Sequence, residues 1–391
     1  MVYLLIGVLC GFPLAPLIFR NMDIWHAHGV WFQAGVLVCF CASLSGYYRR
    51  NEVSIKNLPL SLFILYIGSL TIISCYTAMV TQGMYISGVF LPFVNLLCIV
   101  IFYQIIVSYL TSKSITTVIK SLSLVLIITL LYCTLQSFGI DPFMKVNLAV
   151  TEWKSGYYMK FKHPAVVGFI GNPTHLSAYL GMCVPLLFIW KPVRAWLSTA
   201  LLFIVICFCT NWGSKAVPIT GIITAVIVLW YYLYKTSKKQ FICFVLLSVL
   251  LGAVLLFKEN TNILFEENSR LAIWKYYLTE SKKTFLFGRG LGTILQLSKS
   301  SVFSSVSKLH NEFIHFHFEI GLAGLLLILF AIEDFFKLKV KETKQVIILK
   351  SVFLGFLIQS LTLYPAHLWF TGATAVLAYS GVYAMKNKEN L

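Results

Sequence analysis

Long apolar runs, most of them separated by short polar turns, dominate this chain. A run of about 20 apolar residues is enough to cross the hydrocarbon of a bilayer as a helix. We therefore predict an all-α polytopic membrane protein of about 12 transmembrane helices, with residues 1–391 forming a single integral membrane domain. The predicted spans are 2–19, 29–47, 58–77, 88–110, 121–139, 168–190, 195–211, 214–234, 240–257, 314–332, 345–363 and 367–385.

The composition agrees with this prediction. Charged residues make up 12% of the chain, whereas a soluble domain has about 25%. The mean hydropathy is +0.83. These values exclude a soluble globular protein, a disordered protein and a nucleic-acid-binding domain. All ten cysteines lie within apolar runs, so we expect neither a disulfide nor a metal cluster. The first run lacks a basic flank and a signal-peptidase site, so we expect a retained helix.

The distribution of lysine and arginine predicts the orientation of the spans. Alternate short loops and the C-terminal tail hold 16 basic residues, whereas the intervening short loops hold only Arg20 and Lys215. Because lysine and arginine collect in cytoplasmic loops, we assign the larger set and both termini to the cytoplasm. The larger set is Arg49, Arg50, Lys56, Lys113, Lys120, Lys191, Arg194, Lys235, Lys238, Lys239, Lys337, Lys339, Lys341, Lys344, Lys386 and Lys388.

Two long loops, residues 140–167 and 258–313, fall on the outer side of the membrane. Both carry basic residues, but long loops translocate largely regardless of charge. The basic residues are either ordinary solvated surface or the lining of an electropositive cavity for a phosphate-bearing substrate. In the longer loop, Asn268-Ser269 predicts a helix start and the glycines at 288–292 predict a break. We therefore expect a folded cap.

His310 and Asn311 lie where the longer loop meets the tenth span. A histidine there reaches both water and a lipid-linked substrate, and its ordinary pKa of about 6.5 suits a general base. The alternative is an interfacial polar residue without a catalytic role. His315 and His317 follow on the same helix, but histidines two residues apart point to different faces, so we expect no metal site.

Glu319 lies within the tenth span, where a carboxylate is costly to bury. Such a residue is either functional or paired for helix packing. We expect the Glu319 side chain to face the bundle and to have a partner, either a lysine or arginine from another helix or a histidine that it orients.

Two predicted helix starts on the outer side present N–H groups that favour an anion. Asn172-Pro173 begins the sixth span with His175 in its first turn, and Lys215 begins the eighth. Each has a simpler explanation, a helix cap for Asn172 and a lysine that reaches bulk water for Lys215.

Arg270 and Arg289 are further candidates for binding phosphate, because a guanidinium offers two parallel hydrogen bonds. Arg289 lies in Gly288-Arg289-Gly290-Leu291-Gly292, which no strand precedes, so we exclude a nucleotide-binding loop. Cations at two outward helix N-termini are poorly placed for stability alone. We therefore expect Arg270 and Lys215 to converge beside His310 on one diphosphate.

The order of these motifs resembles the O-antigen ligase superfamily, also called the O-antigen ligase/polymerase family, of polytopic glycosyltransferases that use undecaprenyl diphosphate. The resemblance covers residues 165–325 and implies a C-type glycosyltransferase-like fold with a folded periplasmic loop between helices 9 and 10. Its motifs are Gly171-Asn172-Pro173, Ser214-Lys215, Ser269-Arg270 with Trp274, the glycines 288, 290 and 292, and His310-Asn311 with Glu319, Gly321 and Gly324.

The resemblance implies an O-antigen ligase in the bacterial inner membrane, with its active site on the periplasmic side. Such an enzyme transfers a glycan from undecaprenyl diphosphate to a lipid A–core acceptor by inverting displacement. Its partners are the donor, the acceptor and the lipid bilayer, and it uses no nucleic acid, metal ion or other cofactor.

The resemblance also implies roles for single residues. His310 matches the family's catalytic histidine and Arg270 an arginine that binds the diphosphate, with Arg289 as a further candidate. Lys215 stands where ligases usually have arginine. Lysine keeps the positive charge but cannot make the two parallel hydrogen bonds of a guanidinium. The residues expected to support the substrate are Asn311, Glu319, Asn172 and His175.

Two alternatives remain open. An O-antigen or capsule repeat-unit polymerase shares the topology and the donor but transfers to a lipid-linked glycan. A polytopic transporter or flippase also fits twelve helices. Transporters typically have two similar halves and broken helices near the midplane, and the sequence has no half-to-half repeat.

Overall fold

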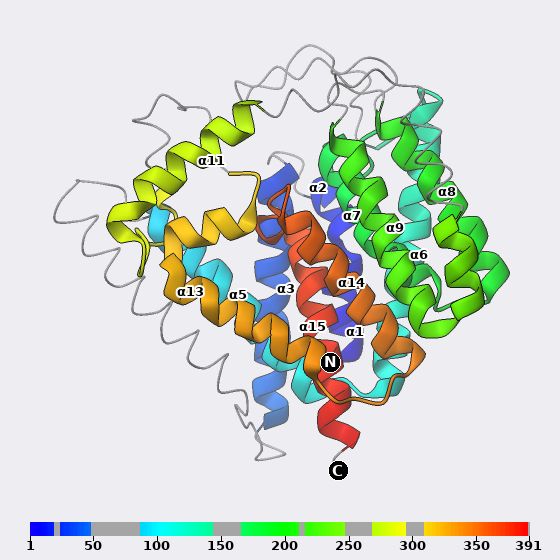
Figure 1. The fold of residues 1–391 in the computed structure, drawn as a ribbon. Helices are drawn as coiled ribbons and strands as arrows, with labels where there is room; N and C mark the ends of the chain where they lie inside the picture. Colours follow the sequence, from blue (N-terminus) through cyan, green and yellow to red (C-terminus); the bar gives the residue numbers. More distant parts are fainter. Residues whose placement is uncertain are drawn as a thin grey trace.

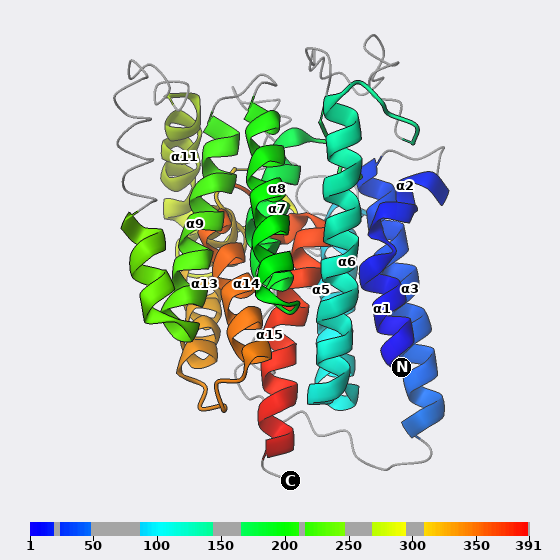
Figure 2. The same ribbon diagram turned by 90° about the vertical axis from the view of Figure 1, so that its right-hand side faces the viewer.

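In a computed structural model, the described residues are 1–18, 24–47, 87–143, 166–210, 216–246, 268–294 and 309–389. Within these ranges the chain is all-α, with twelve α-helices and no strand, which confirms this part of the predicted fold class. The helices pack into a bundle (Figure 1; Figure 2). They are α1 (Val2–Cys10), α2 (Ala15–Ile18), α3 (Ile24–Tyr47), α5 (Ser87–Tyr109), α6 (Ser112–Ser137), α7 (Pro173–Leu187), α8 (Pro192–Thr210), α9 (Ala216–Thr236), α11 (Asn268–Glu280), α13 (Glu312–Lys337), α14 (Lys344–Ser360) and α15 (Trp369–Glu389).

Most of the predicted spans correspond to one helix each. The runs 195–211 and 214–234, which nearly touch, correspond to two elements, α8 (Pro192–Thr210) and α9 (Ala216–Thr236), and residues 211–215 lie outside the described ranges. The run 58–77 lies outside the described residues, and only the first part of 240–257 is described. In the part of the chain that is described, α6 and α13 are long and apolar enough to cross a membrane, and α3, α5, α8 and α9 contain shorter apolar stretches.

The first predicted span, 2–19, is not one helix, which corrects that prediction. α1 ends at Cys10, a 3₁₀ turn covers Phe12–Leu14, and α2 follows. Pro13 interrupts the helix because its nitrogen has no hydrogen to donate. Gly11 lies at the break because α3 packs there closely, and a Cβ on Gly11 would overlap the Trp31 ring.

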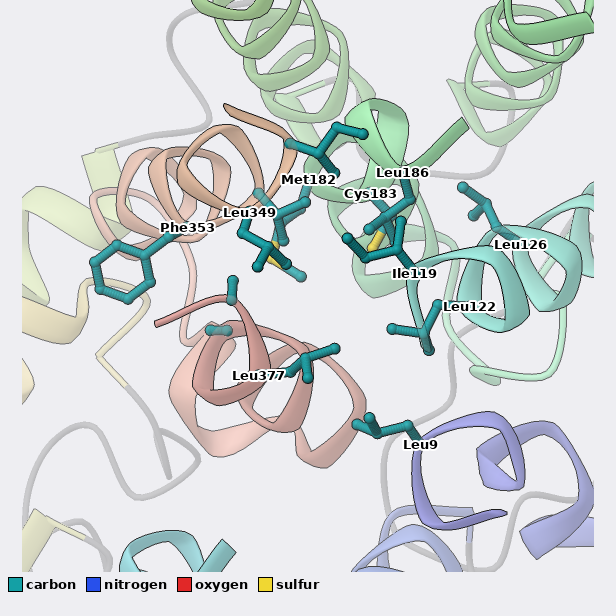
Figure 3. Packing of buried hydrophobic residues seen from close by; sticks show 14 of the residues in the cluster. Leu9, Ile119, Leu122, Leu126, Met182, Cys183, Leu186, Leu349, Phe353 and Leu377 are labelled. Carbon is teal, nitrogen blue, oxygen red and sulfur yellow. The ribbon is translucent and has the colours of Figure 1, made fainter. Parts of the chain in front are cut away.

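α7 lies in the main hydrophobic core, and its side chains from His175 to Leu187 are buried. It packs closely against α9, where a Cβ on Gly181 or Gly221 would collide with the facing backbone. Figure 3 shows side chains of α7 meeting those of α6, α14 and α15. The first turn of α7, which carries His175, is therefore anchored to a closely packed helix.

α13 is broken at Gly321, which has φ +69° and ψ −176°, a conformation that is essentially restricted to glycine. The two halves run in different directions (Figure 1). Residues 285–290, here called the 285–290 loop, bond to the backbone groups that the break leaves without a helical partner. The four hydrogen bonds are Leu322 N→Phe285 O (2.9 Å), Ala323 N→Leu286 O (3.0 Å), Arg289 N→Phe318 O (2.9 Å) and Gly290 N→Glu319 O (2.8 Å).

Candidate functional site

The candidate site is centred on His310, two residues before α13 begins. Its φ of +52° makes it the one non-glycine residue with positive φ in the described ranges. A left-handed conformation costs such a residue about 1–2 kcal/mol, so neighbouring contacts must hold it. Strained backbone of this kind is concentrated at functional sites.

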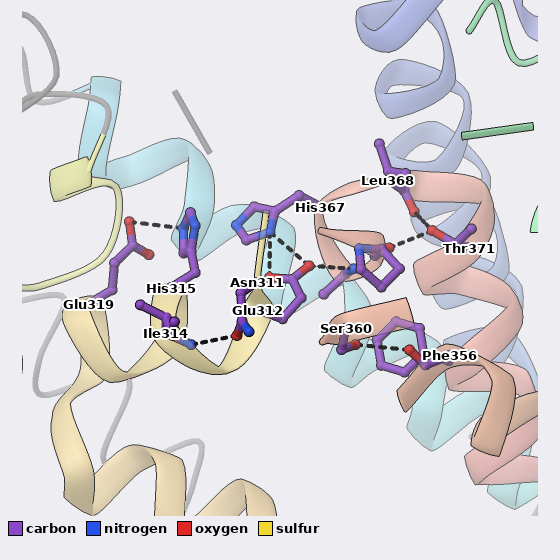
Figure 4. Close-up of polar contacts among 12 residues, drawn as sticks. Asn311, Glu312, Ile314, His315, Glu319, Phe356, Ser360, His367, Leu368 and Thr371 are labelled. Atoms are coloured by element: carbon purple, nitrogen blue, oxygen red, sulfur yellow. Dashed lines mark hydrogen bonds and ion pairs between the residues drawn. The ribbon is translucent and has the colours of Figure 1, made fainter. Parts of the chain in front are cut away.

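Asn311 determines where His310 lies. As the N-cap of α13, its Oδ1 accepts a hydrogen bond from Ile314 N at 3.0 Å (Figure 4). Its Nδ2 donates to Leu361 O at 2.9 Å, just after the end of α14. One side chain therefore ties the start of α13 to the turn between α14 and α15.

Arg270 reaches the same turn from α11. Its Nη1 donates to Thr362 O at 3.3 Å. Trp274, one helical turn later, donates from Nε1 to Leu309 O at 2.6 Å, directly before His310. The helix predicted to begin at Asn268 is present, and these two bonds fasten it to the segments around His310.

Tyr364 links His310 to His175. The Tyr364 ring lies edge-on to both imidazoles, with centroid distances of 5.0 Å to His310 and 5.1 Å to His175. Its Oη is 3.1 Å from His175 Nε2, within hydrogen-bond distance. The three rings thus form a row from the first turn of α7 to the residues that precede α13.

The environment keeps His310 neutral. Burial lowers the pKa of its imidazole from 6.5 to about 4, and the Arg270 guanidinium contributes to the decrease. Burial raises the pKa of Tyr364 to about 12, and the Glu312 carboxylate adds to the increase. At neutral pH a neutral imidazole and a neutral phenol therefore lie near a permanent cation.

Glu312 holds the turn between α14 and α15 against α13 (Figure 4). Its Oε1 accepts a hydrogen bond from Ala366 N at 2.7 Å, and its Oε2 is 3.0 Å from His367 Nδ1. Its side chain is almost completely buried. Because Tyr364 lies in this turn, directly before Pro365, Glu312 helps to fix the position of the Tyr364 ring.

Glu319 has a partner, as expected, and that partner is a histidine on its own helix rather than a lysine or arginine from another helix. Its Oε1 lies 3.5 Å from Nε2 of His315, and both side chains are buried. The His315 ring is in turn 4.3 Å from the His367 ring. Figure 4 shows the His367 and His315 imidazoles next to each other, with the Glu312 carboxylate beside the first and the Glu319 carboxylate beside the second.

Arg289 has partners of its own. Its Nη2 lies 2.8 Å from Glu280 Oε2, and its guanidinium lies over the Phe318 ring at 5.3 Å. These contacts hold the 285–290 loop to α11 and α13, and they involve none of the residues around His310. A role for Arg289 at a diphosphate stays a prediction.

The two predicted helix starts have different outcomes. Asn172 caps α7, because its Oδ1 accepts a hydrogen bond from Thr174 N at 2.8 Å, with Pro173 in the first helical position. That confirms the predicted helix start, and anion binding there stays a prediction. Lys215 lies outside the described residues, so its convergence with Arg270 is also untested.

The sequence analysis assigned no role to Tyr364, His367 or Glu312. A signal was available in Tyr364-Pro365-Ala366-His367, where two polar aromatic residues flank a proline in the short segment between the last two spans. That segment forms a 3₁₀ turn, Pro365–His367.

The arrangement has a definite chemical capacity. A neutral imidazole accepts a proton from a hydroxyl, and a guanidinium stabilises an anion that forms beside it. His310 Nδ1 is buried and has no hydrogen-bond partner in the described part of the chain. The site therefore suits proton removal from a hydroxyl next to a bound anion.

No family model and no curated protein matches this chain.

Proposed function

We propose that this protein is a membrane-embedded glycosyltransferase, an O-antigen ligase that transfers a glycan from undecaprenyl diphosphate to lipid A–core on the periplasmic face. The proposal is carried by the meeting of His310 and Arg270 at the turn between α14 and α15. A base beside a permanent cation is what displacement of a diphosphate by a hydroxyl requires. The order of motifs in residues 165–325 supports the same reaction.

Apolar side chains on outward surfaces support embedding in the inner membrane. α6 buries Leu122 and Leu126, yet it exposes Leu124, Ile128 and Leu131. A helix that is apolar on all sides belongs in a protein core or in lipid. Large exposed apolar patches are rare on soluble monomers, so lipid is the better surrounding for this helix.

In the proposed reaction His310 accepts the proton of the acceptor hydroxyl as its oxygen attacks the anomeric carbon. The bond from that carbon to the phosphate oxygen breaks with inversion, and undecaprenyl diphosphate leaves with the electron pair. Arg270 stabilises the leaving group, with Lys215 and Arg289 as further candidate cations. Proton transfer to His310 contributes about 10²–10⁴-fold to the rate.

A bound diphosphate would also raise the pKa of His310. In the free protein Arg270 contributes to the low pKa of His310. Pairing of Arg270 with the diphosphate offsets this charge and raises the pKa of the imidazole. His310 is thus neutral before the donor binds and becomes a stronger base when the donor is present.

The break in α13 does not favour a transporter. Transporters use broken helices to line a substrate cavity. Here four of the backbone groups next to Gly321 are bonded to the 285–290 loop, so they do not face a cavity.

The reaction is tested with purified protein in phospholipid vesicles that contain an undecaprenyl-diphosphate-linked glycan and lipid A–core. We expect His310→Gln and Arg270→Gln each to lower transfer by about 10²-fold or more. Lys275→Gln is the matched control, because Lys275 is an exposed cation on the same helix as Arg270. Its transfer rate should equal that of the wild type.

Three outcomes separate the alternatives. Full transfer by folded His310→Gln protein would remove His310 from the mechanism. A product that needs only the lipid-linked glycan would identify a repeat-unit polymerase. Absence of transfer to either acceptor would overturn the glycosyltransferase proposal.

A further inference from the structure

We infer that the 285–290 loop is a re-entrant segment that lies within the outer leaflet of the bilayer, where Phe285, Leu286 and Phe287 contact lipid hydrocarbon. The inference rests on the membrane embedding in the proposed function. It concerns the apolar side chains of the loop, which take no part in the proposed reaction.

The depth of the loop follows from the length of α13 beyond its break. A helix rises about 1.5 Å per residue, so Leu322 and Lys337 are about 23 Å apart along the axis. Lys337 begins the basic segment assigned to the inner surface, and the hydrocarbon layer is about 30 Å thick. Leu322 therefore lies about 7 Å or more inside the outer edge of the hydrocarbon. Any tilt of the helix places it deeper.

The loop is held at this depth by hydrogen bonds to the helix. Phe285 O and Leu286 O accept from Leu322 N and Ala323 N at 2.9 and 3.0 Å. Irregular backbone at membrane depth is tolerated only where its polar groups are satisfied by protein. The break at Gly321 supplies these partners, and the loop satisfies the helix ends in return.

The side chains of the loop continue the apolar surface of α13. Phe285, Leu286 and Phe287 are 50%, 51% and 57% exposed. Three exposed apolar residues of α13 follow Leu322 and Ala323, the two residues bonded to the loop. The first is four residues after Leu322, and the other two are three and four residues after the first, so they lie on one face of the helix. They are Leu326, Leu329 and Phe330. This continuity assigns the same lipid surroundings to both surfaces.

The charged residues in the loop and just before it are compatible with this environment. Arg289 is paired with Glu280 at 2.8 Å and covers the Phe318 ring, as expected for ionisable groups near hydrocarbon. Lys282 precedes the apolar residues and is exposed, so its long side chain can extend to the headgroups.

A photo-crosslinking experiment tests the inference in the full chain. p-Benzoylphenylalanine replaces Phe287 in protein reconstituted into vesicles of phosphatidylethanolamine and phosphatidylglycerol. Mass spectrometry of the irradiated protein then records the mass added by a phospholipid. The positive control places the same analogue at Phe330, which has the same exposed fraction of 57%. The aqueous control is Lys339, which is exposed in the turn between α13 and α14.

We expect phospholipid adducts at 287 and 330 in comparable yield, and background yield at 339. Adducts at 330 but not at 287 would overturn the inference and leave the membrane embedding intact. Background yield at 330 as well would overturn the embedding itself, and the inference with it. Elution as a single species in detergent confirms that each variant is folded before it is reconstituted.

Discussion

Replacement of Gly321 by alanine probes the junction between α13 and the 285–290 loop. Gly321 has φ +69° and ψ −176°, and a Cβ there would overlap the Gly288 amide and the Leu286 carbonyl. The Gly321→Ala variant must therefore keep a strained backbone and also displace part of the loop.

The expected loss of stability can be worked from these contacts. A non-glycine residue in this region of φ/ψ space costs about 1–3 kcal/mol. The loop makes four backbone hydrogen bonds to α13, each with a net contribution of about 1 kcal/mol. If half of them are lost, the free energy of unfolding falls by about 4 kcal/mol.

The measurement is chemical unfolding in detergent solution, followed by intrinsic fluorescence. Gly7→Ala is the matched control, because Gly7 lies within α1 and a Cβ there would meet no atom within 4 Å. That variant should equal the wild type or gain up to about 1 kcal/mol from helix propensity. If the free energies of unfolding of Gly321→Ala and Gly7→Ala differ by less than about 1 kcal/mol, this explanation of the junction is wrong.

Two further predictions concern the site. Because the pKa of His310 is lowered to about 4, kcat/KM for transfer should fall with decreasing pH only near pH 4, well below the ordinary histidine pKa of about 6.5. Arg270→Gln removes a positive charge that disfavours protonation of His310, so the decrease in kcat/KM should move to higher pH. Arg270→Lys keeps the charge and should leave it in place. A move to lower pH in Arg270→Gln would contradict the assignment of the decrease to His310. Glu312→Ala leaves the Ala366 amide without its acceptor and should lower the free energy of unfolding by about 2 kcal/mol in the same unfolding assay. Glu312→Gln keeps an acceptor oxygen for the Ala366 amide, so its free energy of unfolding should fall by less. Equal decreases in the two variants would argue against a contribution from this hydrogen bond.

The all-helical architecture could be predicted because hydropathy acts locally along the chain. Apolar runs of helical length predict helices whatever their neighbours are, and the runs 195–211 and 214–234 correspond to two elements, α8 and α9, as expected. The same reasoning failed at 2–19. There a proline and the close approach of Trp31 to Gly11 break the helix.

The candidate site could be predicted only in part. His310, Arg270 and His175 were chosen from their residue types and their places beside predicted spans. Tyr364, which lies between the two histidines, is 189 residues from His175 in the chain. Residue type and periodicity do not encode such a pairing, because it depends on how α7 packs against α14.

By itself, the sequence determined the helical fold class, the helix start at Asn172-Pro173 and the residues worth testing, because each depends on short stretches of chain. Only the tertiary structure decided the partners. Glu312 binds a turn more than 50 residues away, Arg289 pairs with Glu280, and a loop bonds the break at Gly321. Each of these contacts joins segments that only the packed bundle brings together, where a buried charge or an unpaired backbone group must find whatever partner lies within reach.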